Sequence, residues 1–211
     1  MTWTSGADEP IGGRAAQGWD QTATRKEKVL VDARLVVHAQ AGDLDAFVRL
    51  IGLHDRAMRA LAYRLLGNRQ RMDDVLQEAY LKAFRSLGDF KARSAFGSWL
   101  YRIVYNSCMD DLRRGRNGGR FVSLSEADDF ADPMPDPGDT AAQRLDLAAA
   151  LASLSPVMRA TVLLVDAEGM DYEAAAQVLD IPVGTVRSRL SQARRRLRRA
   201  LSEDSRGGDR R

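Results

Sequence analysis

The chain has 211 residues and a formal net charge of only +3, because 32 basic side chains are nearly balanced by 29 acidic ones. One cysteine and two histidines exclude a disulfide framework and a zinc site built from cysteine and histidine within this chain. No apolar run approaches the length that spans a bilayer, and residues 1–21 lack the pattern of a signal peptide. The sequence therefore predicts a cytoplasmic protein without direct membrane insertion.

The charge is distributed unevenly along the chain. Residues 29–116 hold 15 basic and 10 acidic groups, whereas residues 117–140 hold one basic and six acidic groups. The near-neutral total is thus a cancellation between a basic body and an acidic stretch, and such asymmetry indicates function better than the total does.

The first part of the chain changes character at Val29. Residues 1–28 are rich in glycine, alanine and polar side chains without periodicity, which predicts a flexible N-terminal extension. Apolar residues then recur at helical spacing as far as residue 116, and no stretch alternates with a period of two. The pattern predicts four helices: about 31–41, a longer one between Asp43 and Gly67, about 72–87 and about 94–114.

Residues 117–139 separate this body from a second helical one. They combine six acids with helix-breaking glycines and prolines, which predicts an extended, flexible acidic linker. A solvated tether without any partner is the alternative interpretation of this segment.

The second body begins with two predicted helices. Thr140 can cap a helix over residues 141–154, and Ser155 followed by Pro156 favours the start of another helix that ends at Gly169.

A helix-turn-helix pattern follows. Asp171 can cap a short helix over residues 172–179, and a tight turn leads to a helix over residues 183–201. We therefore expect an all-α protein of two small helical domains. Its expected segments are an extension (1–28), a first domain (29–116), the linker (117–139), a second domain (140–201) and a disordered tail (202–211).

The last predicted helix has the composition of a DNA-recognition helix. Residues 187–199 contain seven arginines and no acid. In recognition helices the N-terminal residues reach base edges, whereas more distal cations hold phosphates. Val186, Leu190, Ala193 and Leu197 form the stripe expected to pack inward. A soluble basic helix without a ligand is the alternative.

The helix over residues 72–87 carries a second stripe opposite its apolar face. This stripe contains Asp74, Gln77, Glu78, Leu81 and Arg85. A leucine among acids and an amide favours a protein-binding surface over a merely solvated one.

The helix over residues 94–114 also has two faces. One face can fill the core with Trp99, Leu100, Ile103 and Val104, and the other holds Tyr101, Arg102, Tyr105, Asn106, Met109 and Arg113. Aromatic rings interleaved with cations suit single-stranded nucleic acid, because bases stack on rings while phosphates meet cations. An amphipathic helix with two snorkelling tyrosines is the alternative.

Enzyme chemistry finds no support in the sequence. A glycine-rich phosphate loop, a histidine-containing triad and a carboxylate pair with histidine support are all missing. The pairs Asp73–Asp74 and Asp110–Asp111 diverge by about 100° on a helix, so their members do not easily share a ligand. We therefore predict no catalysis, metal, cofactor or small-molecule substrate, and we expect Cys108 in the core.

Three segments together resemble the bacterial extracytoplasmic-function (ECF) sigma factors, the subunits that direct RNA polymerase to particular promoters. They are Asp73–Tyr80 (DDVLQEAY), Phe96–Asn106 (FGSWLYRIVYN) and Pro182–Arg189 (PVGTVRSR). The resemblance implies a sigma region 2 domain over residues 29–116 and a sigma region 4 helix-turn-helix domain over residues 140–201. It implies a protein that binds core RNA polymerase and directs promoter recognition, DNA melting and transcription initiation at a specific regulon.

The resemblance also assigns roles to individual residues. Docking on core polymerase, through its β′ clamp helices, falls to Asp74, Gln77, Glu78 and Leu81. Recognition and melting of the minus-ten element fall to the loop 89–94 and to Arg93, Phe96, Trp99, Tyr101, Arg102, Asn106 and Arg113. Recognition of the minus-thirty-five element falls to Thr185, Arg187, Ser188, Arg189, Gln192 and Arg195.

The implied partners are core polymerase (β′ clamp helices and β flap), promoter DNA and an anti-sigma factor. Some members of the family carry a larger or basic pair where this chain has Ser191-Gln192, and the N-terminal extension matches no part of the minimal family.

Two rival functions differ from the sigma factor in what they leave unexplained. A helix-turn-helix regulator that acts without polymerase accounts for the last helix, but not for the stripe around Leu81 or the aromatic helix. A nucleic-acid-processing enzyme would show activity on DNA without polymerase.

Overall fold

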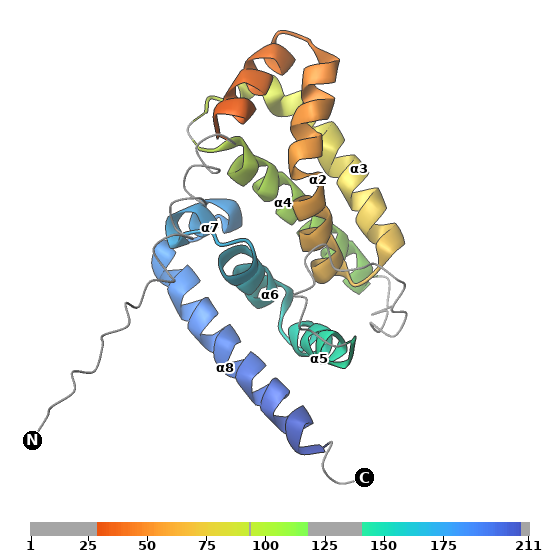
Figure 1. The fold of residues 1–211 in the computed structure, drawn as a ribbon, viewed down its shortest axis with the longest axis vertical. Helices are drawn as coiled ribbons and strands as arrows, with labels where there is room; N and C mark the ends of the chain where they lie inside the picture. The colour runs from red at the N-terminus through yellow and green to blue at the C-terminus, as the bar shows by residue number, and fades with distance from the viewer. Residues whose placement is uncertain (1–28, 93, 118–140, 208–211) are drawn as a thin grey trace, which may run out of the picture.

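The computed structural model describes residues 29–92, 94–117 and 141–207, and all regular secondary structure among them is helical (Figure 1). The predicted all-α class and the two helical domains are confirmed. The expected extension, most of the linker and the Thr140 cap lie outside the described residues.

The N-terminal domain consists of a helix over residues 29–40, α2 (Leu44–Leu66), α3 (Arg69–Ser86), the short η1 (Leu87–Asp89) and α4 (Phe96–Asn117). Its helices enclose side chains that are almost entirely buried, among them Leu50, Met58, Leu61, Met72, Leu76, Leu100 and Val104. Cys108 lies in this core, as expected.

Local signals explain where these helices begin and end. The side chain of Asp43 accepts a hydrogen bond from the backbone N–H of Ala46 at 3.0 Å, which caps α2 at the predicted boundary. Gly67 ends α2 in the left-handed region with φ 66°. Asn68 then caps α3 through the N–H of Arg71, so α3 begins three residues before the predicted start at Met72.

The C-terminal domain consists of α5 (Ala141–Ala152), α6 (Pro156–Val162), a π-helical turn η2 (Leu163–Ala167), α7 (Tyr172–Leu179) and α8 (Val183–Gly207). The predicted start of a disordered tail at residue 202 is wrong, because α8 continues as far as Gly207. Asp171 caps α7 through the N–H of Ala174 at 2.7 Å, as predicted. Asp180 adopts the left-handed conformation (φ 55°) and turns the chain from α7 into α8, which completes the helix-turn-helix.

The two domains pack against each other, which the sequence pattern did not predict. Helix α7 lies beside α4 in Figure 1, and one continuous buried apolar cluster includes Tyr101 and Tyr105 of α4 with Ala175 and Val178 of α7. The face of α4 that was expected to meet nucleic acid therefore has a protein cover in this arrangement.

Candidate nucleic-acid and protein interfaces

Helix α8 presents its cations to solvent. Val186, Leu190 and Ala193 are buried, which confirms the predicted inward stripe. Four residues of the predicted minus-thirty-five set are exposed: Arg187, Ser188, Gln192 and Arg195. The other two, Thr185 and Arg189, are half-buried.

Two arginines of α8 have partners within the C-terminal domain. The guanidinium of Arg187 lies 5.7 Å from the centre of the Tyr172 ring, a cation–π arrangement. Arg194 pairs with Asp166 of η2, and this hydrogen bond raises the pKa of the Arg194 guanidinium. Arg194 and Arg195 are both exposed, but Arg194 is directed toward Asp166 of its own domain.

The second face of α4 is divided between buried rings and exposed polar groups. Tyr101, Tyr105 and Met109 are each only 7% exposed, whereas Arg102 and Asn106 are exposed. The hydroxyl of Tyr101 donates to Glu168 at 2.5 Å, and Arg102 lies 3.6 Å from the carboxylate of Asp180.

The environment of Tyr101 keeps its hydroxyl protonated. Burial raises the pKa of Tyr101, and the adjacent charge of Glu168 raises it further. Burial likewise raises the pKa of Tyr105. A hydroxyl that holds its proton remains a hydrogen-bond donor, which stabilises the contact between Tyr101 and Glu168.

A buried arginine joins the two domains. The Arg159 guanidinium donates to the carbonyls of Leu151 and Ala152, both at 2.8 Å, and to that of Leu154 at 3.2 Å. It also donates to the carbonyls of Arg64 and Leu65 at the end of α2, both at 3.2 Å. Arg159 thus donates to backbone carbonyls at the ends of α2 and α5 and at Leu154, and so connects the two domains.

An aromatic cluster lies where η1 leads into α4. The rings of Phe90, Phe96 and Trp99 have centroids 5.1–5.9 Å apart, and we call this trio the aromatic cluster. Beside it is an open pocket of about 250 Å³ lined by Asp89, Phe90, Lys91, Ser94 and Trp99. Arg93 of the predicted minus-ten set lies outside the described residues.

The backbone beside this pocket has an unusual conformation. Ala92 adopts φ 52°, in the left-handed region that non-glycine residues seldom occupy. Such conformations cost about 1–3 kcal/mol and are concentrated at ligand sites. The strained residue Ala92 and the aromatic cluster therefore both indicate a ligand site at the loop between η1 and α4.

The predicted stripe of α3 lies at the surface. Asp74 and Gln77 are exposed, Leu81 is 49% exposed and Glu78 is half-buried. We call these four residues the α3 stripe.

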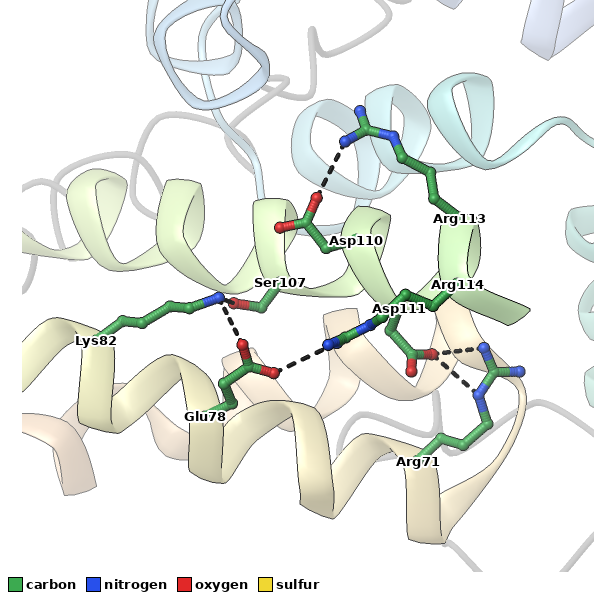
Figure 2. Close-up of polar contacts among 8 residues, drawn as sticks. All are labelled: Arg71, Glu78, Lys82, Ser107, Asp110, Asp111, Arg113 and Arg114. Carbon is green, nitrogen blue, oxygen red and sulfur yellow. Dashed lines mark hydrogen bonds and ion pairs between the residues drawn. The ribbon is translucent and has the colours of Figure 1, made fainter. Parts of the chain in front are cut away.

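Figure 2 shows how Glu78 connects the α3 stripe with α4. Its carboxylate lies 2.8 Å from Lys82 and 3.4 Å from Arg114, and the hydrogen bond from Lys82 is the main cause of its lowered pKa. Lys82 also donates to Ser107 of α4 at 3.3 Å. Glu78 therefore stays ionised while it is shared between two cations of different helices.

Arg113, the last residue of the predicted minus-ten set, pairs with Asp110 one turn earlier at 3.0 Å (Figure 2). Both side chains are at the surface, so solvent screens this pair and the guanidinium is readily transferred to another anion.

Three residues of these sites were not named individually from the sequence. Phe90 lies within the predicted loop 89–94, and the repeated aromatics at 90, 96 and 99 were a detectable signal of the aromatic cluster that it completes. Arg159 interrupts the otherwise largely apolar stretch 156–165, which was also visible in the sequence. Glu168 had no such signal, because its partner Tyr101 is 67 residues away in the chain.

No group of histidine, cysteine and carboxylate side chains suited to a metal ion occurs in the described part of the chain. None of the described helices combines the length and apolar character needed to cross a membrane.

The described residues form an all-helical protein with a C-terminal helix-turn-helix whose last helix carries exposed arginines, an architecture typical of DNA-binding proteins. Comparison with known families makes this more specific: residues 50–118 match sigma-70 region 2, and residues 144–197 match sigma-70 region 4.

Curated relatives of this chain are named as ECF RNA polymerase sigma factors. The chain is 39% identical to the ECF RNA polymerase sigma factor SigE of Mycolicibacterium smegmatis over 161 residues, which are 74% of this chain and 62% of that protein. It is 37% identical to the ECF RNA polymerase sigma factor SigM of Mycobacterium tuberculosis over 172 residues, which are 81% of this chain and 84% of that protein.

A solved structure agrees with these relatives. The sigma factor RpoE of Bartonella quintana, crystallised with the anti-sigma factor NepR, superposes with a TM-score of 0.62 at 30% identity, over 74% of this chain and 96% of that one. The chain therefore belongs to the ECF RNA polymerase sigma factor family, and the predicted resemblance is confirmed.

Proposed function

We propose that this chain acts in the cytoplasm as a subunit of RNA polymerase that binds core enzyme and then promoter DNA. Sigma factors are transcription initiation factors rather than classical enzymes, so the catalysis belongs to the polymerase. The observation that carries the proposal is the presence of three separate surfaces on one chain: the α3 stripe, the aromatic cluster with its pocket, and the arginines of α8. A regulator that only bound duplex DNA would need the last of these alone.

Each surface has chemistry suited to one contact. The α3 stripe surrounds a half-exposed leucine with polar groups, which suits the β′ clamp helices. The pocket beside Trp99 suits an unstacked base of the minus-ten element, because stacking and hydrogen bonds gained there offset a few kcal/mol of unstacking. Helix α8 suits the major groove of the minus-thirty-five element, and the β flap is the proposed polymerase contact of the C-terminal domain.

Promoter binding requires the two domains to separate. Tyr101 and Tyr105 are buried under the C-terminal domain, so their rings are inaccessible to DNA in this arrangement. We infer that separation accompanies the assembly of the chain with core polymerase.

An anti-sigma factor is the proposed inhibitory partner. The RpoE structure contains the anti-sigma factor NepR, and the superposition with this chain covers 96% of that sigma factor. A protein that covered the α3 stripe would prevent the chain from joining core polymerase.

In-vitro transcription tests the proposal directly. Core polymerase supplied with this chain should start transcripts at promoters that share two upstream elements, and the chain alone should have no activity on DNA. Absence of transcripts from every promoter that responds to the chain in cells would refute the proposed function.

The α3 stripe can be tested separately. Gln77→Ala with Glu78→Ala should weaken core binding about tenfold or more, because truncating contributing interface residues costs more than about 1 kcal/mol. The matched control is Glu173→Ala with Gln177→Ala, which removes the same residue types from an exposed face of α7. Equal core affinity for the two double variants would contradict the assignment of this surface.

A further inference from the structure

The helix over residues 29–40 lies before the segment that matches sigma-70 region 2, which begins at residue 50. Two polar contacts nevertheless connect this helix to the aromatic cluster and its loop. One passes through His54 of α2, and the other comes from Gln40 at the end of the helix.

The first contact is a buried pair. Nε2 of His54 lies 3.0 and 3.1 Å from the two carboxylate oxygens of Asp32, and the two residues are only 5% and 6% exposed. Because a carboxylate only accepts hydrogen bonds, Nε2 carries a proton and donates it. The orientation of the imidazole is thereby fixed.

The other side of this imidazole faces the first turn of α4. The ring centroids of His54 and Phe96 are 5.5 Å apart. A Cβ added to Gly97 would lie 3.1 Å from Cε1 of His54, so only glycine permits this close approach without movement of the ring. Asp32 thus orients His54, and His54 supports Phe96 of the aromatic cluster.

The second contact holds the loop itself. The amide of Gln40 donates to the carbonyl of Leu87 at 2.9 Å and to that of Phe90 at 3.0 Å. These carbonyls belong to the first residue of η1 and to the residue that follows η1, and Phe90 itself lines the pocket. One helix therefore fixes Phe90 through the backbone and Phe96 through an imidazole.

We propose that the helix over residues 29–40 positions the pocket beside Trp99 to select a single unstacked base, with Gln40 and the Asp32–His54 pair as positioning residues. The proposal rests on the proposed function, which assigns an unstacked base to this pocket. A buried polar pair of this kind is weak evidence for stability, since apolar residues of similar volume serve as well. The Asp32–His54 pair instead fixes the orientation of the imidazole, because its hydrogen bonds allow only one orientation of the ring against Phe96.

The test uses holoenzyme assembled from core polymerase and the full chain. It measures affinity for single-stranded minus-ten oligonucleotides in which each base in turn is replaced by an abasic site. With the wild-type chain, the abasic site at the pocketed position should lower affinity about fivefold or more, as loss of base stacking does. This ratio of affinities does not depend on the fraction of active protein, so a loss of folded protein leaves it unchanged.

Gln40→Ala should reduce the ratio at that position at least about threefold, since a displaced Phe90 weakens stacking. Asp32→Ala should do the same, and Asp32→Asn should restore the ratio because an amide oxygen still accepts from His54. His38→Ala is the matched control, because His38 is an exposed residue of the same helix.

Unchanged ratios in both Gln40→Ala and Asp32→Ala would overturn the positioning role while leaving the pocket intact. If no abasic position lowered the affinity of the wild-type holoenzyme about fivefold or more, the proposed function of the pocket would be overturned, and the positioning role with it.

Discussion

The two helices proposed to bind DNA differ in the exposure of the side chains that would contact it. Helix α4 has its tyrosines covered, with Tyr101 and Tyr105 each 7% exposed. Helix α8 leaves Arg187 and Arg195 in solvent.

The difference follows from the chemistry of the side chains. An aromatic ring loses little when protein replaces water around it, provided that its hydroxyl finds a partner, as Tyr101 does in Glu168. A guanidinium without a full set of acceptors is costly to bury. A nucleic-acid face made of rings is therefore one that a protein can cover reversibly, whereas a face made of arginines stays open.

Arg159 is the exception, because five carbonyls accept from its guanidinium. It is therefore the residue whose loss should have the largest effect. Arg159→Met should lower the free energy of unfolding by about 3 kcal/mol, since several buried carbonyls lose their donor. Urea denaturation measures this, with Arg194→Met as a control whose surface pair is worth at most about 1 kcal/mol. Equal losses in the two variants would show that burial of Arg159 does not matter.

The open face should respond to salt. Arg187→Ala should cost about 1–3 kcal/mol at a cognate minus-thirty-five duplex and reduce discrimination between sequences. Arg195→Ala should weaken binding to all duplexes and lower the slope of log affinity against log salt by about 1. Anisotropy titrations of holoenzyme at several salt concentrations measure both effects. Arg56→Ala, an exposed arginine of α2, is the control, and a slope that fell equally in this variant would contradict the role of Arg195.

The covered face should open more easily when its hydrogen bond is removed. Tyr101→Phe keeps the ring but loses the contact with Glu168, which should destabilise the closed arrangement by about 1 kcal/mol. Energy transfer between dyes on α2 and α8 should then report a larger separated fraction. An unchanged distance distribution would mean that apolar packing alone holds the cover in place.

This contact also predicts a pH dependence. The pKa of Tyr101 is raised in the folded chain, so its contribution is fully present below the pKa of an unfolded tyrosine, about 10, and is lost as pH rises above that value. The stability of the wild-type chain should therefore fall more steeply above about pH 10 than that of Tyr101→Phe. Equal slopes of the free energy of unfolding against pH in the two proteins above about pH 10 would contradict this prediction.

The smallest effect is expected inside the N-terminal domain. Burial raises the pKa of the Cys108 thiol to about 12, so almost no thiolate exists near neutral pH. We expect separation of the domains to leave this core closed, so alkylation by iodoacetamide should be equally slow in wild type and Tyr101→Phe. Fast labelling in urea supplies the reference. Rapid labelling of the native variant would show that the covered face and the core open together.

The sequence by itself determined the helices and the family. Asp43, Gly67 and Asp171 fixed helix boundaries because capping is local, and the stripes of α3 and α8 followed from helical spacing. The start of α3 was missed because Asn68 both follows one helix and caps the next. The two faces of α4 were also predictable, since periodicity separates them whatever covers the second face.

Only the tertiary structure decided what covers that second face. Tyr101 meets Glu168 across 67 residues, and Arg159 meets the carbonyls of α2 across 94 and 95 residues. Helical periodicity reports which side chains share a face, but it carries no information about which distant element packs on that face. The partner depends on how two domains join, and that depends on contacts between side chains and backbone groups that are far apart in the chain.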